Sequence, residues 1–263
     1  MTSNDTAQDL VNRRIYHAAG IHQWYRSDAP LDRAETMALL KYQAAFAGRE
    51  VLDLGIGTGR TTPFLAPLAA RYVGTDYSPP MVEYVRSHMP EIDVRLADMR
   101  DLSAFPSGSF DFAMASCNVI DAVSHEDRLR TLGEWHRVLR PHGIVMFSSH
   151  NRRYHRALAG PALARSRNPV TQLRHLQQYV RSVINHARVG RLRRVDGEYA
   201  LLNDVGHDYA ALHYYIDRDT QRRHLEQSGF LLRDVFAGFG GVVGNAGDDS
   251  ASPSLLYVAE RGA

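Results

Sequence analysis

The sequence predicts an α/β protein with a doubly wound, open sheet, and the clearest evidence lies in residues 50–60. Val51, Leu52 and Leu54 form a short apolar run, typical of a buried parallel strand. The run leads directly into three glycines at alternate positions, 55, 57 and 59. A strand that passes through a glycine-rich turn into a helix exposes bare backbone, which a ligand can approach more closely than it can approach side chains. An ordinary turn needs one glycine, so three indicate a ligand site.

Strand and helix patterns alternate after this turn, as expected for parallel strands joined by crossover helices. Segments with strand character cover residues 71–76, 93–96, 112–116 and 144–149. Between the last two, apolar residues recur with helical spacing from Ser124, a typical N-cap, to Leu139. Trp135 lies on the apolar face of this helix and is expected in the core.

Two acidic residues and one arginine indicate which ligand the turn binds. The dinucleotide fingerprint Gly-x-Gly-x-x-Gly requires a third glycine where this chain has Arg60. Asp53, at the end of the strand, would face the ligand, where a carboxylate is unfavourable beside a pyrophosphate but suits a cationic amino group. The next strand ends at Asp76, whose carboxylate can accept both ribose hydroxyls of a nucleoside. Helix capping is the competing interpretation, for which Ser78 is the better residue.

Residues 51–59, Val-Leu-Asp-Leu-Gly-Ile-Gly-Thr-Gly, resemble the first motif of the class I S-adenosylmethionine-dependent methyltransferases of small-molecule type. Residues 76–81, Asp-Tyr-Ser-Pro-Pro-Met, resemble the second motif, and residues 134–143 match the family again. The resemblance is strong over residues 50–149 and weaker from 217 onward. It implies a Rossmann-like sheet of seven strands, mostly parallel, with an antiparallel last strand near residues 254–260 and an N-terminal helical cover.

The resemblance also implies S-adenosyl-L-methionine as the cofactor and S-adenosyl-L-homocysteine as its product; a nicotinamide nucleotide is the competing interpretation. Asp98 stands where the family contacts the adenine amino group. The expected cofactor-binding residues are Tyr25, Asp53, Gly55, Gly57, Gly59, Asp76, Tyr77, Met81, Asp98, Met99 and Asn118. For Asn118, which follows the fourth strand, a turn-forming role is equally consistent with the sequence.

Methyl transfer to a hydroxyl needs a general base, most often histidine, whereas an amine need only arrive unprotonated. Of 13 histidines, two are selected by position. His150 lies at the carboxyl end of the fifth strand, and His213 lies where an insertion rejoins the core. We predict these two as catalytic residues. The expected substrate-binding residues are Tyr16, His150, Asn151, His213 and Tyr214. No spacing of histidine, cysteine and acidic residues indicates a metal site.

The predicted organisation has four parts. These are an N-terminal cover (residues 1–48), a cofactor-binding core (49–150), a basic insertion that shapes the substrate site or forms a lid (151–214), and a segment that completes the core (215–263). Residues 151–195 contain eleven arginines and no acid, while the rest of the chain carries a net charge of −9. Within the insertion, a helix with an apolar stripe is expected from Asn168 or Thr171. Residues 198–215 have the pattern of a hairpin.

The arginine-rich segment admits four interpretations: a solvated helix face, a nucleic-acid track, a surface for an acidic carrier protein or anionic substrate, and a membrane-surface helix. Aromatic residues for base stacking are scarce there, so nucleic acid is the weaker partner.

The composition is that of a globular chain: 44% hydrophobic and 23% charged residues exclude a disordered one. One cysteine, Cys117, excludes an internal disulfide, and no apolar run is long enough for a signal peptide or membrane span, so the cytoplasm is the expected location.

We therefore predict a methyltransferase acting on an oxygen or nitrogen of a small molecule, in specialised-metabolite biosynthesis, with a homodimer as one oligomeric state. The alternatives are a tRNA or rRNA methyltransferase that uses the basic insertion, and a protein that binds S-adenosylmethionine without turnover.

Overall fold

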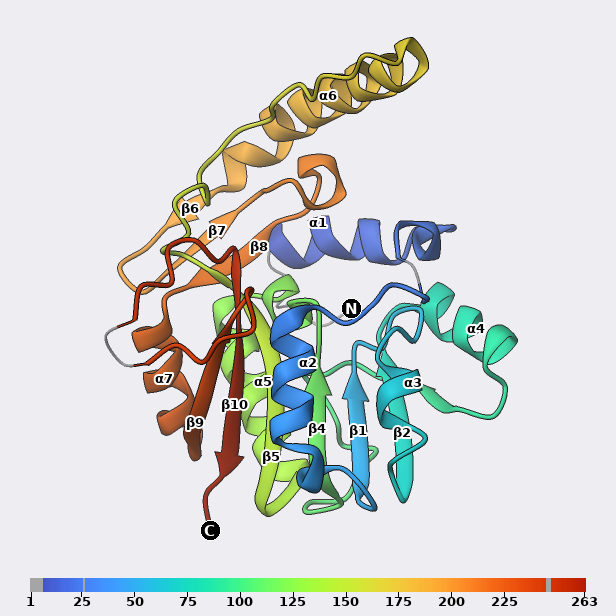
Figure 1. Cartoon of the computed structure of the whole chain (residues 1–263), viewed down its shortest axis with the longest axis vertical. Helices are drawn as coiled ribbons and strands as arrows, with labels where there is room; N and C mark the ends of the chain where they lie inside the picture. The colour runs from blue at the N-terminus through green and yellow to red at the C-terminus, as the bar shows by residue number, and fades with distance from the viewer. Residues whose placement is uncertain (1–6, 26, 245–246) are drawn as a thin grey trace.

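A computed structural model describes residues 7–25, 27–244 and 247–263. The predicted sheet is present, and Figure 1 shows its strands side by side in the centre of the molecule. Seven strands follow the order β3 (Asp93–Leu96), β2 (Arg71–Asp76), β1 (Glu50–Leu54), β4 (Phe110–Ala115), β5 (Leu139–Asn151), β10 (Ser254–Arg261) and β9 (Phe230–Ala237). Neighbouring strands from β3 to β5 are parallel, and β10 is antiparallel to both β5 and β9. The predicted fold class, with its single antiparallel strand in the seven-stranded core, is confirmed.

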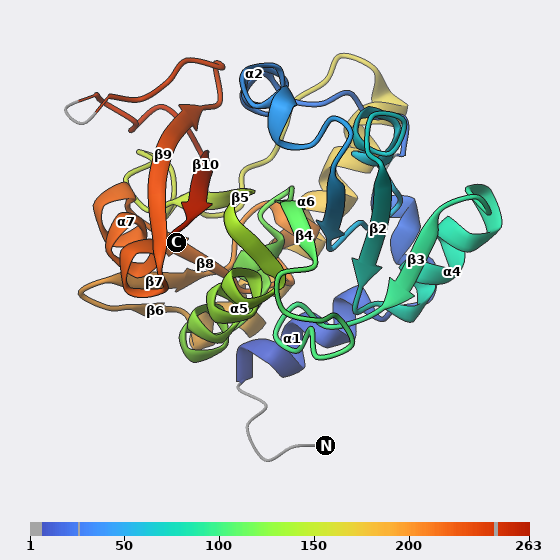
Figure 2. The ribbon, with the colours of Figure 1, turned by 90° about the horizontal axis from the view of Figure 1, so that it is seen from below.

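Helices cover both faces of this sheet (Figure 2). One face packs against α5 (His125–Val138) and α7 (Arg218–Gln227), with Trp135 fully buried as predicted. The other face packs against α2 (Arg33–Lys41), α3 (Thr62–Leu65) and α4 (Pro79–His88). The two apolar layers, one on each face, hold the strand ends in fixed register.

The insertion extends the same sheet. Strand β8 (His213–Ile216) pairs in parallel with the end of β5. Strand β7 (Tyr199–Leu202) pairs with β8 as the predicted hairpin, and β6 (Arg194–Val195) pairs with β7. The hairpin loop contains the 3-10 helix η5 (Gly206–Tyr209), and β6 is preceded by η4 (Gly190–Leu192). As a result His150, at the end of β5, lies opposite Tyr215 of β8.

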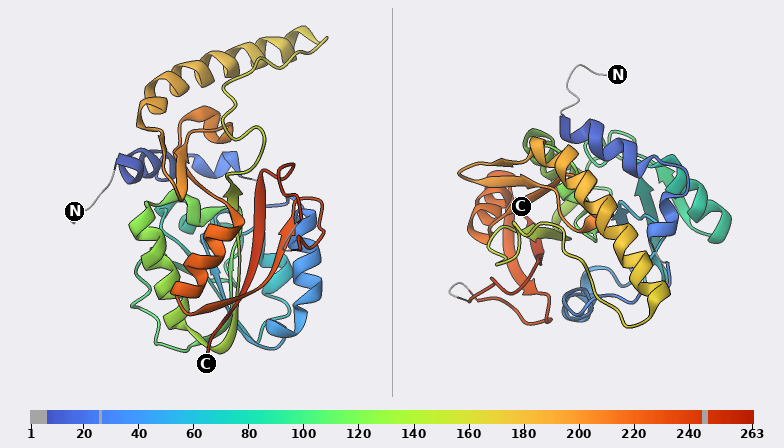
Figure 3. Two further views of the ribbon diagram at one scale, coloured as in Figure 1. Left: turned by 90° about the vertical axis from the view of Figure 1, so that its left-hand side faces the viewer. Right: turned by 90° about the horizontal axis from the view of Figure 1, so that it is seen from above.

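Helix α6 (Pro169–Val189) lies beyond this extension, at the far end of the molecule (Figure 3). Asn168 caps it, accepting hydrogen bonds from the backbone N–H groups of Val170 and Thr171. The first of the two predicted start residues is therefore correct. Within the described part of the chain, no helix is long and apolar enough to cross a membrane.

The N-terminal segment crosses the sheet edge at which β1, β2 and β4 end (Figure 1). It consists of α1 (Ala7–Tyr16) and the 3-10 helix η1 (Ile21–Trp24); a second short helix, η2 (Gln43–Ala45), precedes β1. Buried side-chain amides fasten α1: Gln8 and Asn12 both donate to the carbonyl of Leu212, and Asn12 also donates to that of Ala122, the last residue of the 3-10 helix η3 (Val119–Ala122). The segment thereby closes over the sheet edge.

Candidate active site

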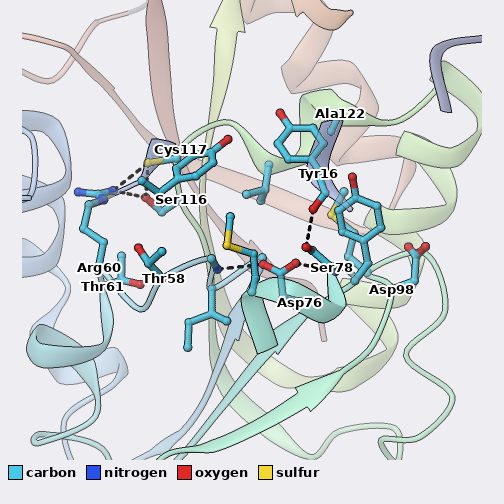
Figure 4. Close-up of a pocket in the computed structure, with 18 of the residues that line it drawn as sticks. Tyr16, Thr58, Arg60, Thr61, Asp76, Ser78, Asp98, Ser116, Cys117 and Ala122 are labelled. Atoms are coloured by element: carbon cyan, nitrogen blue, oxygen red, sulfur yellow. Dashed lines mark hydrogen bonds between the residues drawn. The ribbon is translucent and has the colours of Figure 1, made fainter. Parts of the chain in front are cut away.

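A cavity of about 410 Å³ lies between this N-terminal segment and the carboxyl ends of β1, β2 and β4. Figure 4 shows the side chains that line it, with Arg60 at one end and Asp98 at the other. Nine of the predicted site residues form part of its wall: Tyr16, Tyr25, Gly55, Gly57, Asp76, Tyr77, Met81, Asp98 and Met99. Both the turn after β1 and the end of β2 therefore face one enclosed space.

The glycine turn has backbone angles that favour glycine. Gly55, Gly57 and Gly59 all have positive φ, between 57° and 82°. A Cβ at Gly55 would lie 2.7 Å from Val119 Cγ1, whereas a Cβ at Gly57 would meet nothing within 4 Å. Gly59 is outside the cavity wall, against the side chain of Met89. The prediction that Gly59 contacts a ligand is thus corrected: it shapes the turn.

Asp76 is 6% exposed and binds the backbone of the glycine turn. Its Oδ2 accepts the N–H of Gly57 at 2.9 Å, and its Oδ1 accepts the N–H of Ser78 at 2.8 Å. Burial raises the pKa of Asp76 to about 6, although these backbone hydrogen bonds act in the opposite direction. Each carboxylate oxygen keeps a further lone pair for a donor in the cavity. The arrangement suits the two hydroxyls of a ribose.

Asp98 belongs to a charged cluster that the sequence did not reveal. Arg100 donates to both oxygens of Asp98, at 2.9 and 2.7 Å, and also to Asp9 at 2.7 Å and Asp127 at 2.8 Å. Burial opposes ionisation of Asp98, but Arg100 outweighs it and lowers the pKa of that carboxyl. Asp98 is thus an ionised acceptor at the cavity wall, beside the apolar side chain of Met99.

Asp53 does not face the cavity, so its predicted contact with the ligand is corrected. It is 1% exposed, and its Oδ2 accepts hydrogen bonds from the Thr61 hydroxyl at 2.5 Å and the Tyr72 hydroxyl at 2.6 Å. Burial raises its pKa to about 6, against these two donors. Because Tyr72 belongs to β2 and Thr61 lies at the start of α3 on the cavity wall, Asp53 anchors the turn to β2 and α3.

Arg60 supplies the positive charge at the other end of the cavity. Its guanidinium is bidentate to Glu35, at 2.8 and 2.5 Å, and also contacts Ser116 Oγ at 2.6 Å and Cys117 Sγ at 3.1 Å. The sequence singled out Arg60 only as a departure from the dinucleotide pattern. The partnership with Glu35, 25 residues away, has no local signal.

Aromatic side chains of the N-terminal segment form the wall opposite the glycine turn. Tyr16, Trp24 and Tyr25 all line the cavity. The hydroxyl of Tyr25 lies 2.8 Å from Nε2 of His207, and burial lowers the pKa of His207 to about 4. The hydroxyl of Tyr16 lies 3.4 Å from Nε2 of His213. The insertion therefore reaches the cavity through the two tyrosines.

His213 forms the middle of a chain of polar contacts that ends at the cavity. Its Nδ1 lies 2.9 Å from Oδ2 of Asp204, which also accepts the hydroxyl of Tyr215 at 2.7 Å. Burial opposes a charge on His213, but the Asp204 carboxylate outweighs it and raises the pKa of the imidazole above its usual 6.5. The predicted direct contact of His213 with a substrate is corrected, because Tyr16 stands between them. Asp204 was missed, since the hairpin loop carries no motif.

His150 lies directly beside His213, with ring centroids 5.0 Å apart, but it also does not line the cavity. Its Nδ1 lies 2.7 Å from Oδ2 of Asp121, which also accepts the His150 N–H. Asp121 is fully buried and pairs with the equally buried Arg128 at 2.5 Å. The structure thus brings the two predicted histidines together, and assigns His150 a supporting position behind the wall.

Three further predictions are corrected by packing. Asn151 is fully buried and donates to the carbonyls of Asp249 and Ser252, so it fastens a loop instead of binding substrate. Tyr214 is also fully buried, with its ring over Arg128 and its hydroxyl 2.8 Å from His125 Nδ1. Asn118 is outside the cavity wall, and its left-handed backbone (φ 57°) at the start of η3 fits the turn-forming interpretation.

Among the described residues, two clusters have spacing that could hold a metal ion: His150 with Asp204 and His213, and His125 with Glu198 and His224. In the first, the two imidazole planes are stacked within 17° of parallel, so in-plane lone pairs of the two rings do not converge on one point. His213 and Tyr215 meanwhile both contact Asp204. This geometry favours a hydrogen-bond network at that site.

The sheet order, with the glycine turn after β1 and an acid at the end of β2, is the topology of a Rossmann-like α/β fold. Residues 51–143 match the family model of the methyltransferase domain. The chain therefore contains a methyltransferase domain over these residues, and the predicted resemblance to the class I S-adenosylmethionine-dependent methyltransferases is confirmed for this domain.

Curated relatives carry related descriptions. A probable S-adenosylmethionine-dependent methyltransferase of Mycolicibacterium smegmatis is 35% identical over 40% of this chain and 40% of its own length. The ubiquinone biosynthesis O-methyltransferase of Xanthomonas oryzae pv. oryzae is 31% identical over 51% of this chain and 59% of its own length. The cypemycin N-terminal methyltransferase of a Streptomyces species is 34% identical over 53% of this chain and 51% of its own length. The chain thus spans roughly half the length of these relatives.

Solved structures agree on the fold. One is an S-adenosylmethionine-dependent methyltransferase from Mesorhizobium loti, with a TM-score of 0.58 and 23% identity. The match covers 87% of this chain and 98% of that protein's chain. The magnesium protoporphyrin IX methyltransferase of Synechocystis, solved with bound S-adenosylmethionine, covers 99% of this chain and all of its own (100%) with a TM-score of 0.58 and 13% identity. At these identities the likeness concerns the fold alone.

Proposed function

We propose that this protein transfers a methyl group from S-adenosylmethionine to an oxygen or nitrogen of a small molecule, as a step in specialised-metabolite biosynthesis. The proposal rests on the composition of one cavity. Asp76 and the glycine turn line one side of it and Tyr16 lines the other, with His213 and Asp204 behind Tyr16. Cofactor and acceptor would meet in that single space.

The cavity offers a partner to each part of the cofactor. Asp76 suits the ribose hydroxyls, Asp98 the adenine amino group, and Met99 the face of the adenine ring. Arg60 suits the amino-acid carboxylate, although Glu35 neutralises part of its charge. When bound, S-adenosylmethionine supplies a methyl group on a sulfonium that is its own leaving group. The protein's main contribution is then to hold the acceptor in line with that methyl group.

The acceptor's proton has a path into the protein. Asp204 accepts the Nδ1–H of His213, so neutral His213 presents an unprotonated Nε2 to the Tyr16 hydroxyl. During methyl transfer to a hydroxyl acceptor, the acceptor's proton would pass to the Tyr16 oxygen while Tyr16 releases its own proton to Nε2 of His213. Burial raises the pKa of Tyr16 well above its usual value, so this residue acts as a neutral relay and not as a stored phenolate.

The composition of the wall supports a small acceptor. None of the eleven arginines of residues 151–195 lines the cavity, whose neighbouring cations are Arg60 and Arg100, both paired with carboxylates. A nucleic-acid substrate would need phosphate contacts next to the reacting base. The names of two relatives, a ubiquinone biosynthesis O-methyltransferase and a cypemycin N-terminal methyltransferase, fit oxygen and nitrogen acceptors respectively.

The test is a screen for formation of S-adenosylhomocysteine with panels of phenols, catechols, amines and short peptides, and with bulk tRNA. We expect turnover with a small-molecule class and none with tRNA. For a hydroxyl acceptor, His213→Gln should lower kcat about 10²- to 10⁴-fold, and Tyr16→Phe should act similarly. The exposed His142, at the opposite sheet edge, provides the matched control His142→Gln. Turnover should rise with pH through a midpoint above 6.5, because only neutral His213 accepts a proton.

Two results would contradict the proposal. Methylation of tRNA alone would favour the nucleic-acid alternative. Retained cofactor binding without turnover on any panel member would favour the non-catalytic alternative. A hydroxyl acceptor whose turnover is unaffected in both His213→Gln and Tyr16→Phe would reject the relay.

A further inference from the structure

Helix α6 faces the protein with its polar side. Gln178 and Arg181 contact the carboxylate of Asp208 at 2.8 and 3.3 Å, and Asn185 donates to the Asp208 carbonyl at 3.0 Å. All three contacts join α6 to η5, in the loop of the insertion hairpin. A helix on the surface of a globular protein normally turns its apolar side inward, so this arrangement is reversed.

The apolar side of α6 is consequently exposed. Its members recur every three or four residues and so share one helix face. They are Val170 (60% exposed), Leu173 (56%), Leu176 (45%), Val180 (48%), Val183 (42%) and Ile184 (50%). We call this set the apolar stripe. Figures 1 and 3 show α6 standing clear of the sheet, so that the described part of the chain leaves one long side of the helix open. A continuous exposed stripe of this kind marks an interaction surface.

The charged side chains of α6 itself have a single sign. Arg174, Arg181 and Arg188 are exposed on α6 itself, and residues 151–195 contain eight further arginines and no acid. Arg181 also pairs with Asp208 of η5, whereas the ion pairs of the described residues include none for Arg174 or Arg188. The surface therefore combines aliphatic side chains with an excess of positive charge.

We propose that α6 binds an anionic lipid bilayer, lying in the plane of the interface with the apolar stripe among the acyl chains and the arginines at the headgroups. This combination is typical of interfacial amphipathic helices. With 21 residues, α6 is about 31 Å long. The convex surface of a single helix fits the flat surface of a bilayer. A second copy of the chain would bring two acid-free arginine clusters together, which is electrostatically unfavourable. The bilayer would lie on the side of the molecule where β1 and β4 end, the side of the cavity (Figure 1).

The experiment is flotation of the full chain with vesicles of phosphatidylcholine alone and with vesicles of equal parts phosphatidylcholine and phosphatidylglycerol. We expect binding to the second kind and little to the first. The variant Leu173→Ser/Val180→Ser/Ile184→Ser should lose about a hundredfold in affinity. Its matched control, Leu40→Ser/Leu68→Ser/Leu231→Ser, changes three equally exposed residues elsewhere and should bind as the wild type does.

A second pair of variants isolates the charge. Arg174→Gln/Arg188→Gln should weaken binding about thirtyfold, since each arginine near an anionic surface contributes about fivefold. Arg33→Gln/Arg49→Gln removes the same charge from exposed positions outside the insertion and should have little effect. Circular dichroism and cofactor affinity report whether each variant is folded.

Absence of wild-type binding to the anionic vesicles would overturn the proposal, as would equal binding by the stripe variant and its control. A dimer in solution that the stripe variant dissociates, without vesicle binding, would assign the stripe to a second copy. Binding to an acidic protein without vesicle binding would likewise reject the lipid surface.

Discussion

The two sides of the cavity are built in different ways. The cofactor side comes from residues close to one another in the sequence: the glycine turn and Asp76 lie within 22 residues of each other, and Asp98 follows soon after. The opposite side joins Tyr16 to His213, which are 197 residues apart, through contacts between the N-terminal segment and the insertion. The positions of the cofactor-side residues follow from the strand ends and the backbone angles of the turn. The positions of the residues on the opposite side depend on packing between distant parts of the chain.

This difference assigns the two sides separate tasks. The cofactor side depends mainly on the strand order and on the geometry of the turn, which Asp76 holds by accepting the backbone N–H groups of Gly57 and Ser78. The opposite side is specific to this chain, because the insertion supplies Asp204, His207 and His213. Changes on one side should therefore leave the other largely intact, and the following predictions test that independence.

The largest effect is expected from Arg128→Ala, which removes the partner of the fully buried Asp121 behind His150. An uncompensated buried carboxylate should lower the free energy of unfolding by about 3–5 kcal/mol. Urea denaturation measures this loss. Arg95→Ala, which breaks an ion pair with both partners more than 40% exposed, is the control and should cost about 0–1 kcal/mol. The folded fraction of Arg128→Ala should keep its cofactor affinity. A loss of cofactor affinity as large as that of Asp76→Ala would show that the two sides are coupled.

A smaller effect is expected from Asp76→Ala on the other side. The variant loses the acceptor for two backbone N–H groups of the turn and for ribose hydroxyls, so the free energy of cofactor binding should weaken by about 1–3 kcal/mol. Titration calorimetry measures the change, with Asp111→Ala at the opposite sheet edge as a control. Affinity should also fall in the wild type as the pH drops below about 6, where Asp76 becomes protonated. Unchanged affinity in the variant would remove the ribose assignment.

The smallest expected effect concerns the protonation of His213. The pKa of this imidazole is raised, so the Asp204–His213 ion pair stabilises the fold fully below pH 6.5 and loses that contribution as the pH rises through the raised value. In Asp204→Asn, burial is opposed only by the weaker effect of the Asp121 carboxylate, so the pKa of His213 should fall. Titration of the imidazole C–H resonances by NMR distinguishes the two cases. Equal midpoints in wild type and variant would mean that Asp204 does not set the charge of His213.

The sequence predicted what depends on neighbours along the chain. The glycine turn and Asp76 follow from motif spacing, the strands follow from apolar runs, and Asp98 follows from the resemblance to the family. It failed for Asp53, because the carboxyl end of a strand can point into the core, where Tyr72 and Thr61 satisfy the carboxylate. It also placed His150 and His213 in contact with substrate, although they lie one side chain behind the wall.

The residues that the sequence missed are those whose partners are remote. Asp204 is an ordinary loop residue until β7 and β8 bring it to His213 and Tyr215. Arg60 acquires its role from Glu35 on α2, and Arg100 from Asp9 on α1. Such pairs become predictable only after the packing of the N-terminal segment is known, because neither member has an unusual local pattern.

The most direct test of the central claim is calorimetric titration of the purified chain with S-adenosylmethionine, S-adenosylhomocysteine and NAD. The geometry of the glycine turn, Asp76 and Asp98 predicts dissociation constants on the order of micromolar for the two sulfur nucleosides, and no binding of NAD, since Arg60 replaces the third glycine of the dinucleotide fingerprint. Binding of NAD, or no binding of either sulfur nucleoside to the folded chain, would contradict the assignment of the cavity and the mechanism built on it.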